Sequence, residues 1–381
     1  MTTIPLSTSR TATGAAQGAA FDDFFLPGPT AVRDDVLAAM TRPMIAHRGK
    51  AFETLFAELQ VGLRTVFGTA RPVFVSTSSA TGLMEAGIRC APAGPVLSVV
   101  NGAFSERYAQ IARGCEREVD VLAIPPGHAA TPDDVAARLA AGRHAVVTVA
   151  HSETSTGALT DVRGIREVAA RHGATCLVDS VTGVGGAELT FDAWGLDYAL
   201  TGSQKALAMP PGLSFAVASE GYMQTARAAR GRGLYFDLVE FEEYARKHQT
   251  PNTPGTSLLY AAAVQLGHIA AESMPARCAR HAAMARQTHA WVDAHAERFG
   301  IGILAPADGR SPTVTAVTTP EGITGDDIVR ACAARGIVIG AGYGATKAYT
   351  FRVGHMGDHT PETIARCLDV VEDALAELTG R

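Results

Sequence analysis

The segment from Thr175 to Phe215 constrains the fold of this 381-residue chain more than any other stretch. It holds two short apolar runs, and each run leads to a reactive polar side chain. Residues 175–178 end at Asp179, and residues 196–200 are followed, after a short polar stretch, by Lys205. Such runs, bounded by Gly and Ser, are typical of strands that are buried on both faces. Ligands of an open α/β sheet bind beyond the carboxyl ends of its strands, so we expect Asp179 and Lys205 to face one crevice.

An acid and an amine in one crevice suit pyridoxal phosphate (PLP). Lys205 would form an imine with the aldehyde, and Asp179 would keep the pyridine nitrogen protonated so that the ring can take up electrons. These two residues also allow a plainer interpretation, because Asp-Ser is a common turn or helix cap and a Lys after Gly-Ser is commonly solvated. The apolar residues 206–209 and the Pro-Pro-Gly after them favour PLP, since a lysine that must lose its proton needs apolar surroundings.

The motifs of this segment resemble those of a known family. They are Asp179-Ser180-Val181, Gly185-Gly186, Gly202 to Leu207, and Pro210-Pro211-Gly212. They are similar to the motifs of class V aminotransferases, and most of all to those of the alanine–glyoxylate and serine–glyoxylate group. The resemblance covers nearly the whole chain. It implies an α/β fold, that of the fold-type I PLP-dependent transferases, in which a large domain with a mostly parallel seven-stranded sheet precedes a smaller α+β C-terminal domain.

Composition agrees with a two-domain enzyme. With 47% hydrophobic and 19% charged residues, the chain can bury a large core. We expect a flexible segment over residues 1–22, which are rich in Thr, Ser, Ala and Gly, a large PLP-binding domain over 23–270, and a small domain over 271–381.

Composition also excludes several classes of function. The net charge is −5 and no Lys/Arg run is dense enough to bind nucleic acid. No apolar run is long enough to span a membrane. The six cysteines are scattered without a CxxC pair, which argues against a disulfide framework or a metal site. We therefore expect a cytoplasmic enzyme whose partners are small molecules and a second copy of itself.

A strand over residues 73–75 leads into a turn rich in Ser and Thr and then into a helix. The first N–H groups of a helix are free and attract anions, and hydroxyl groups add donors. A plain helix cap needs one such residue, whereas five of the six residues 76–81 are Ser or Thr. The resemblance implies that Ser79, Ala80 and Thr81 bind the PLP phosphate.

Two further segments match the family next to predicted strands. Phe104 follows the strand over residues 96–100, at the position where the family has an aromatic ring against the pyridine. Thr154 lies in the segment 151–157, where the family places a hydroxyl near the ring oxygen. Glu153 could be an acid–base group, but we expect it to order the loop, because Lys205 already serves as the base. The resemblance also implies cofactor contacts for the residues that flank the Asp and Lys motifs, Val181 and Gln204.

Candidate substrate-binding residues lie near both ends of the chain. Arg352 stands inside an apolar strand, where its charge is costly unless paired, and a substrate carboxylate would pair it. The family's substrate-binding Arg falls at this position. The resemblance also implies that backbone near Gly28 helps to hold the carboxylate. The glycine-rich residues 340–344 resemble a dinucleotide turn, but no helix pattern follows, so we interpret them as a mobile loop at the substrate entrance.

The family completes its phosphate site with a Thr-Pro segment from the partner subunit. Here the match slips by one residue, so that either Thr253 or Asn252 takes this role. Residues 250–254 also allow a plain turn. The family assignment implies a homodimer whose sites are completed across the interface.

We predict from these features a PLP-dependent aminotransferase that works by a ping-pong mechanism. A small amino acid such as alanine, serine or glycine would donate its amino group to glyoxylate or pyruvate, since no second Arg stands where it could bind a side-chain carboxylate. A 2-aminoethylphosphonate transaminase stays open as an alternative. A cysteine desulfurase-like lyase is the other alternative, although residues 336–350 lack its Cys and Gln204 stands where desulfurases have His.

Overall fold

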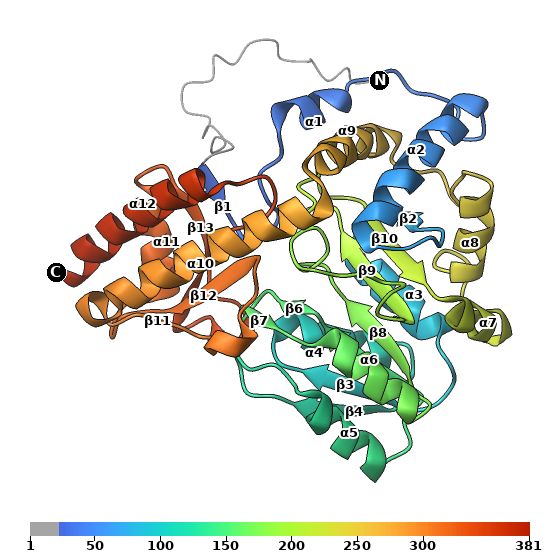
Figure 1. Ribbon diagram of the computed structural model, residues 1–381, viewed down its shortest axis with the longest axis horizontal. Helices are drawn as coiled ribbons and strands as arrows, with labels where there is room; N and C mark the ends of the chain where they lie inside the picture. The colour runs from blue at the N-terminus through green and yellow to red at the C-terminus, as the bar shows by residue number, and fades with distance from the viewer. Residues whose placement is uncertain (1–22) are drawn as a thin grey trace, which may run out of the picture.

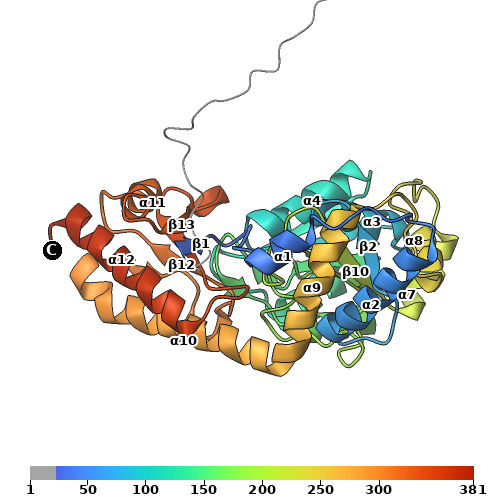
Figure 2. The same cartoon turned by 90° about the horizontal axis from the view of Figure 1, so that it is seen from above.

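The computed structural model of the protein describes residues 23–381, so the segment expected to be flexible, 1–22, lies outside the described residues. Two sheets lie side by side, each with its own helices, and the long helix α10 (Met274–Phe299) runs along one face of the smaller one (Figures 1 and 2). Within residues 23–381 no helix is long and apolar enough to cross a membrane. The same part of the chain holds no group of His, Cys, Asp or Glu that could bind a metal ion.

The larger sheet has seven strands in the order β2-β10-β9-β8-β5-β3-β4. All neighbours are parallel except β10, which is antiparallel to both β2 and β9. The mostly parallel seven-stranded sheet expected from the sequence is thus confirmed. In chain order, its strands are β2 (Phe74–Ser76), β3 (Val96–Val100), β4 (Val119–Ala123), β5 (Val146–Ala150), β8 (Thr175–Asp179), β9 (Tyr198–Gly202) and β10 (Ser214–Ala218).

Alternating residues of the central strands point into two separate cores. On β8, Cys176 and Val178 face one core and Leu177 faces the other. The first core is shared with α2 (Lys50–Phe67), α5 (Pro132–Ala141), α6 (Val162–Arg171) and α9 (Thr256–Glu272). The second is shared with α3 (Ala80–Cys90), α4 (Ala103–Gly114), α7 (Glu220–Ala228) and α8 (Leu238–Arg246). Helices on both faces explain why these strands have nearly continuous apolar sequences.

The smaller sheet has five strands in the order β1-β13-β14-β12-β11. They are β1 (Phe24–Phe25), β11 (Gly302–Ile303), β12 (Val314–Thr318), β13 (Val338–Ala341) and β14 (Thr350–Gly354). This sheet packs on α10, α11 (Gly325–Ala333) and α12 (Pro361–Thr379) around a core of its own. A short hairpin of β6 (Ser152–Glu153) and β7 (Ala158–Leu159) completes the sheets, and α1 (Asp34–Ala39) packs on α9.

One sequence expectation about boundaries needs correction. The range 23–270 is predicted as the large domain, but Phe24 and Phe25 pair with Val338 and Ile339 of the small sheet. The helices α9 and α10 are separated at Ser273, whose φ is 71° and whose hydroxyl accepts a hydrogen bond from Ala276 N. A residue in this left-handed conformation cannot continue a right-handed helix, so the chain turns there.

Candidate active site

Asp179 and Lys205 line one cavity, as the sequence predicts. Asp179 is the last residue of β8, and the neighbouring parallel strand β9 ends three residues before Lys205. The cavity has a volume of about 110 Å³. Its walls are formed by Ser79, Ala80, Thr81, Met84, Phe104, Arg107, Ser152, Thr154, Asp179, Val181, Thr182, Gln204 and Lys205.

Lys205 is buried, and no carboxylate of residues 23–381 lies within hydrogen-bond reach of its charge. Its Nζ donates a 2.5 Å hydrogen bond to Pro27 O and lies 5.7 Å from the centre of the Phe104 ring. Burial, together with the positive charge of Arg352, lowers the pKa of Lys205 to about 8. An amine with this pKa is partly unprotonated near neutral pH, as a nucleophile and proton acceptor needs to be.

Only one of the two carboxylate oxygens of Asp179 accepts a hydrogen bond from the described residues. Oδ1 accepts a 2.9 Å hydrogen bond from Val181 N, whereas Oδ2 accepts none from the described part of the chain. Burial raises the pKa of Asp179 to about 7, because few groups near it stabilise its negative charge. A cationic ring nitrogen at the cavity side would supply the missing partner.

Gly28 lies directly against the side chain of Lys205. Its φ is +107°, and a Cβ added there would lie 2.3 Å from Lys205 Cδ and 2.5 Å from Nζ. The next residues also hold the lysine loop, since Thr30 N donates to Gln204 O and Thr30 Oγ1 donates to Lys205 O. Only glycine fits this close approach.

The Ser- and Thr-rich turn divides into two groups. Ser76, Thr77 and Ser78 have partners within the fold: Ser78 bonds to Ser76 and to a serine of β10, and Thr77 accepts from Gly255 N. Ser79 precedes α3, yet its hydroxyl makes no capping hydrogen bond. Ser79 and Thr81 line the cavity instead, where the free N–H groups of the first helical turn face the same space.

Glu153 orders the loop that presents Phe104, as the sequence analysis expects. Its fully buried carboxylate accepts hydrogen bonds from the backbone N–H groups of Phe104 and Ser105, and from Ser155 N and the hydroxyls of Ser105 and Ser155. It thereby neutralises the positive N-terminal end of α4. Both carboxylate oxygens of Glu153 are occupied by these hydrogen bonds. Glu153 therefore has a structural role and does not act as an acid–base group.

Arg352 lies next to the cavity without lining it. Its Nε donates to Ala341 O at 2.9 Å and its Nη1 to Thr154 O at 3.2 Å. No carboxylate of the described residues forms an ion pair with it, and burial lowers its pKa to about 10. Thr154, which lines the cavity, shares a hydrogen bond between its hydroxyl and that of Thr182.

Thr253 and Asn252 do not reach this cavity from their own chain. Both are exposed, and they line a separate small hollow together with Tyr235 and Phe241. Arg48 holds the preceding turn by donating to Thr250 O and Pro251 O. The assignment of a partner-subunit role to one of them therefore stays a prediction.

Sequence reasoning missed several residues of the site. Arg107 lies 5.1 Å from the centre of the Phe104 ring, and its Nη2 is 3.4 Å from Tyr343 OH. Arg107 is thus an arginine in the cavity wall that the sequence analysis did not name. Tyr343 stacks on Phe104 with 5.4 Å between ring centres, so the 340–344 loop does lie at the site. The signal for Arg107 was its position three residues after Phe104, on the same helix face.

The comparisons with known proteins agree with this geometry. A family model described as aminotransferase class-V matches residues 34–359. The chain belongs to the class-V aminotransferases. An uncharacterized aminotransferase of Methanocaldococcus jannaschii is 36% identical over 360 residues, which cover 93% of this chain and 92% of that protein. The L-aspartate–glyoxylate aminotransferase of Paracoccus denitrificans is 30% identical over 364 residues, which cover 93% and 91%. The crystal structure of an alanine–glyoxylate aminotransferase from Nostoc sp. matches with a TM-score of 0.87 at 28% identity, and covers 98% of this chain and 100% of that one.

Class-V aminotransferases are PLP-dependent, and the cavity of this class-V aminotransferase fits that coenzyme. An unused helix N-terminus with two free hydroxyls suits a phosphate, and a ring at Phe104 suits an aromatic face. The unpaired oxygen of Asp179 suits a pyridinium N–H, and the buried Lys205 suits an aldehyde. These four features surround a single cavity.

Proposed function

We propose that this enzyme transfers the amino group of a small amino acid to a 2-oxo acid such as glyoxylate or pyruvate. The observation that carries the proposal is the convergence of Lys205, Asp179 and the free N-terminus of α3 on one cavity. Glyoxylate is supported as an acceptor because it appears in the names of the Paracoccus and Nostoc relatives. Those two names give different donors, aspartate and alanine, so they leave the donor open.

The coenzyme, when bound, supplies an aldehyde for the amino group and a ring that takes up electrons. Each cavity residue then has a separate task. Ser79, Ala80 and Thr81 bind the phosphate, and Phe104 lies against the ring. Thr154, Val181 and Gln204 complete its surroundings. Asp179 would accept a hydrogen bond from the protonated ring nitrogen. Lys205, with its lowered pKa, would remove the proton from the substrate α-carbon and return it to the coenzyme carbon that carried the aldehyde.

We assign the substrate carboxylate to Arg352 and to the backbone at Gly28. Arg352 uses two of its N–H groups on backbone carbonyls and keeps the rest of its planar fork available. It has no ion-pair partner among the described residues, which is the state expected of a guanidinium that awaits a carboxylate. Gly28 is fixed against Lys205, so a carboxylate held there lies next to the reacting amine.

The alternative of a cysteine desulfurase-like lyase has less support. That chemistry needs a thiolate at the substrate, and none of the six cysteines lines the cavity. Burial raises the pKa of the thiols of Cys90 and Cys332 to about 12, which leaves them unreactive. A 2-aminoethylphosphonate transaminase is not excluded by the cavity, since Arg107 and Arg352 both suit an anionic substrate.

We further propose a cytoplasmic homodimer in which Thr253 or Asn252 completes the phosphate site of the partner subunit. Large apolar side chains are exposed near these residues: Leu234 is 86% and Tyr235 50% accessible in the single chain. Tyr235 shares the hollow with Asn252 and Thr253. Exposed apolar groups around polar residues mark subunit interfaces. The unpaired cysteines are consistent with a reducing compartment.

The visible spectrum of the purified protein tests the proposed function. We expect an absorption band of PLP that is lost with one amino donor and restored by glyoxylate. The donors are L-alanine, L-serine, glycine, L-cysteine and 2-aminoethylphosphonate, with L-aspartate added because Arg107 lies in the cavity. A Lys205→Ala variant should bind PLP without covalent attachment and without turnover. A band that resists all six donors would refute transamination of these classes.

A further inference from the structure

A buried arginine outside the cavity contacts both of the loops that carry the reactive groups. Arg277, in the first turn of α10, is only 1% exposed. Its Nη2 donates to Ala206 O at 2.8 Å, directly after Lys205, and its Nε donates to Gly185 O at 3.0 Å, in the turn after Asp179. One guanidinium therefore holds the peptide segments that follow both strand ends.

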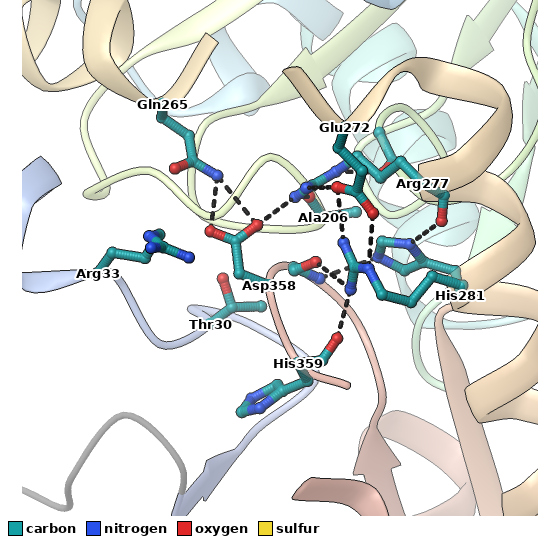
Figure 3. Close-up of polar contacts among 12 residues, drawn as sticks. Thr30, Arg33, Ala206, Gln265, Glu272, Arg277, His281, Asp358 and His359 are labelled. Carbon is teal, nitrogen blue, oxygen red and sulfur yellow. Dashed lines mark hydrogen bonds and ion pairs between the residues drawn. The ribbon is translucent and has the colours of Figure 1, made fainter. Parts of the chain in front are cut away.

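The same side chain belongs to a balanced cluster of charges (Figure 3). Arg277 pairs with Glu272 and with Asp358, each at 2.8 Å. Glu272 also binds Arg280 at 2.7 Å, so two cations face two anions. Gln265 Nε2 donates to both oxygens of Asp358. A buried charge without partners destabilises a fold, and these ion pairs offset the desolvation of Arg277.

The cluster also fixes the loop that follows β14, the strand of Arg352. His281 Nε2 accepts from Gly357 N, and His281 Nδ1 donates to Arg277 O. These two contacts require a neutral ring with its proton on Nδ1, in agreement with the pKa of His281, which burial holds well below its usual value. Arg280 Nη1 donates to the carbonyls of Gly357 and His359.

A further series of contacts connects the 357–359 loop back to the amine of Lys205. His359 Nε2 donates to Phe24 O, and the His359 ring stacks on Phe25 with 4.4 Å between centres. Two residues later, Pro27 O accepts the hydrogen bond from Lys205 Nζ. The amine of Lys205 thus bonds to the segment that follows β1, and the peptide after Lys205 bonds to Arg277; β1 and Arg277 both contact the 357–359 loop.

We propose that Arg277 is a positioning residue for catalysis: it holds Lys205, through Ala206, in register with the 357–359 loop and thus with Arg352. This inference rests on the proposed roles of Lys205 and Arg352. The decisive property is the guanidinium fork, because only a side chain with several fixed donors reaches Gly185, Ala206, Glu272 and Asp358 at once.

The test uses Arg277→Lys, which keeps the charge that Glu272 and Asp358 need but loses the fork. We expect a folded protein that binds PLP within about threefold of wild type, because α3 and Phe104 are untouched. Turnover per bound coenzyme should fall about 10- to 100-fold, since displacements of about 1 Å in an active site have effects of this size. The KM for the amino donor should change less than kcat.

A second readout does not depend on turnover. When PLP is added to the apoenzyme, the Lys205 amine condenses with the coenzyme aldehyde and releases one water. Trapping with borohydride, followed by peptide mass spectrometry, measures the rate of this linkage. We expect it to be at least about tenfold slower in Arg277→Lys than in wild type. If wild type itself is not trapped at Lys205, the proposed function fails; if wild type is trapped and the variant equals it, the positioning role fails.

Arg280→Lys is the matched control, because Arg280 pairs with the same Glu272 and touches the 357–359 loop without contacting Ala206. We expect its linkage rate and kcat to stay within about threefold of wild type. Equal losses in the two variants would show that general packing of the loop, and not the hold on Ala206, sets the rate, and would overturn the proposal. Should Arg277→Lys not fold, Asp358→Asn tests the other half of the proposal, because it weakens the link between Arg277 and the 357–359 loop and leaves the contact between Arg277 and Ala206 in place. We expect the linkage rate to stay within about threefold of wild type and kcat to fall at least about tenfold. An unchanged kcat would overturn the proposed register between Lys205 and this loop.

Discussion

At the scale of single residues, Gly28 gives the sharpest prediction. A methyl group there would overlap Lys205 Cδ and Nζ, and the φ of +107° disfavours any residue with a Cβ. We expect Gly28→Ala to lower kcat at least about tenfold, because the reacting amine must move. Gly173→Ala is the control, since Gly173 has a φ of +72° but no atom within 4 Å of the added Cβ. Both variants should lose about 1 kcal/mol or more of stability, measured by denaturant unfolding, and only the first should lose activity.

The raised pKa of Asp179 leads to a prediction of how the stability of the coenzyme-free protein depends on pH. Its ordinary pKa is 3.8, and burial raises it to about 7 in the folded chain. Between these values the folded state binds the proton more tightly than the unfolded state does, so this group makes the free energy of unfolding fall as pH rises from about 4 to about 7. The Asp179→Asn variant should lack this component. Denaturant unfolding of both proteins at pH 5 and pH 7.5 measures it; an equal pH dependence in the two proteins would show that Asp179 is not perturbed.

The positions of the cavity residues were accessible from sequence where a motif tied them to a strand end or a helix start. Asp179, Lys205 and Ser79 follow or begin regular elements, so their side chains share one edge of the sheet. The polar cluster around Arg277 was not accessible in this way. Its partners lie up to 92 residues from Arg277 along the chain, and no local pattern relates Arg277 to Ala206 or Asp358.

At the scale of elements, the start of α4 shows how one buried carboxylate sets the position of an aromatic ring. Glu153 accepts hydrogen bonds from the N–H groups of Phe104 and Ser105. We expect Glu153→Gln to destabilise the protein by about 2 kcal/mol, because charge-assisted hydrogen bonds and the interaction with the helix dipole are lost. Thermal and denaturant unfolding measure this loss.

The control for that prediction lies in the same helical turn. Glu106 is exposed and its carboxylate makes no hydrogen bond or ion pair with the described residues, so Glu106→Gln should change stability by less than about 0.5 kcal/mol. PLP affinity should weaken in Glu153→Gln only, since Phe104 is no longer fixed. Similar losses in both variants would mean that net charge near the helix N-terminus, and not the buried hydrogen bonds, determines the effect.

A helix or strand could be predicted from the sequence where its own residues show a clear pattern. The strand over 96–100 has a nearly continuous apolar run, and the structure has it at these bounds. The two-residue strand β1 has no such signal, because its pairing depends on β13, more than 300 residues away. The antiparallel direction of β10 follows from its short connection to β9, which lacks the helix that a parallel crossover needs.

At the scale of the whole molecule, the remaining question is whether one chain completes its own site. Within the chain, the first turn of α3 provides backbone N–H groups and two hydroxyls for a phosphate, but no cation among the described residues pairs with that helix start. Thr253 and Asn252 are exposed on a turn that Arg48 holds in place. An exposed polar turn beside exposed apolar side chains is the arrangement expected of a segment donated to a symmetric partner.

Mixing two inactive variants tests this donation. Lys205→Ala removes the amine of a site, and Thr253→Asp places a negative charge where the proposed partner phosphate lies. If Thr253 acts on the partner, a mixed dimer has one site with both changes and one site with neither. Random reassociation makes about half of the dimers mixed, and each regains one site of two, so activity should recover to about a quarter of wild type. The same mixture with Asn252→Asp decides between the two residues. If Thr253 acted within its own chain, no mixture would recover activity, and a monomeric protein in light scattering would exclude donation by either residue.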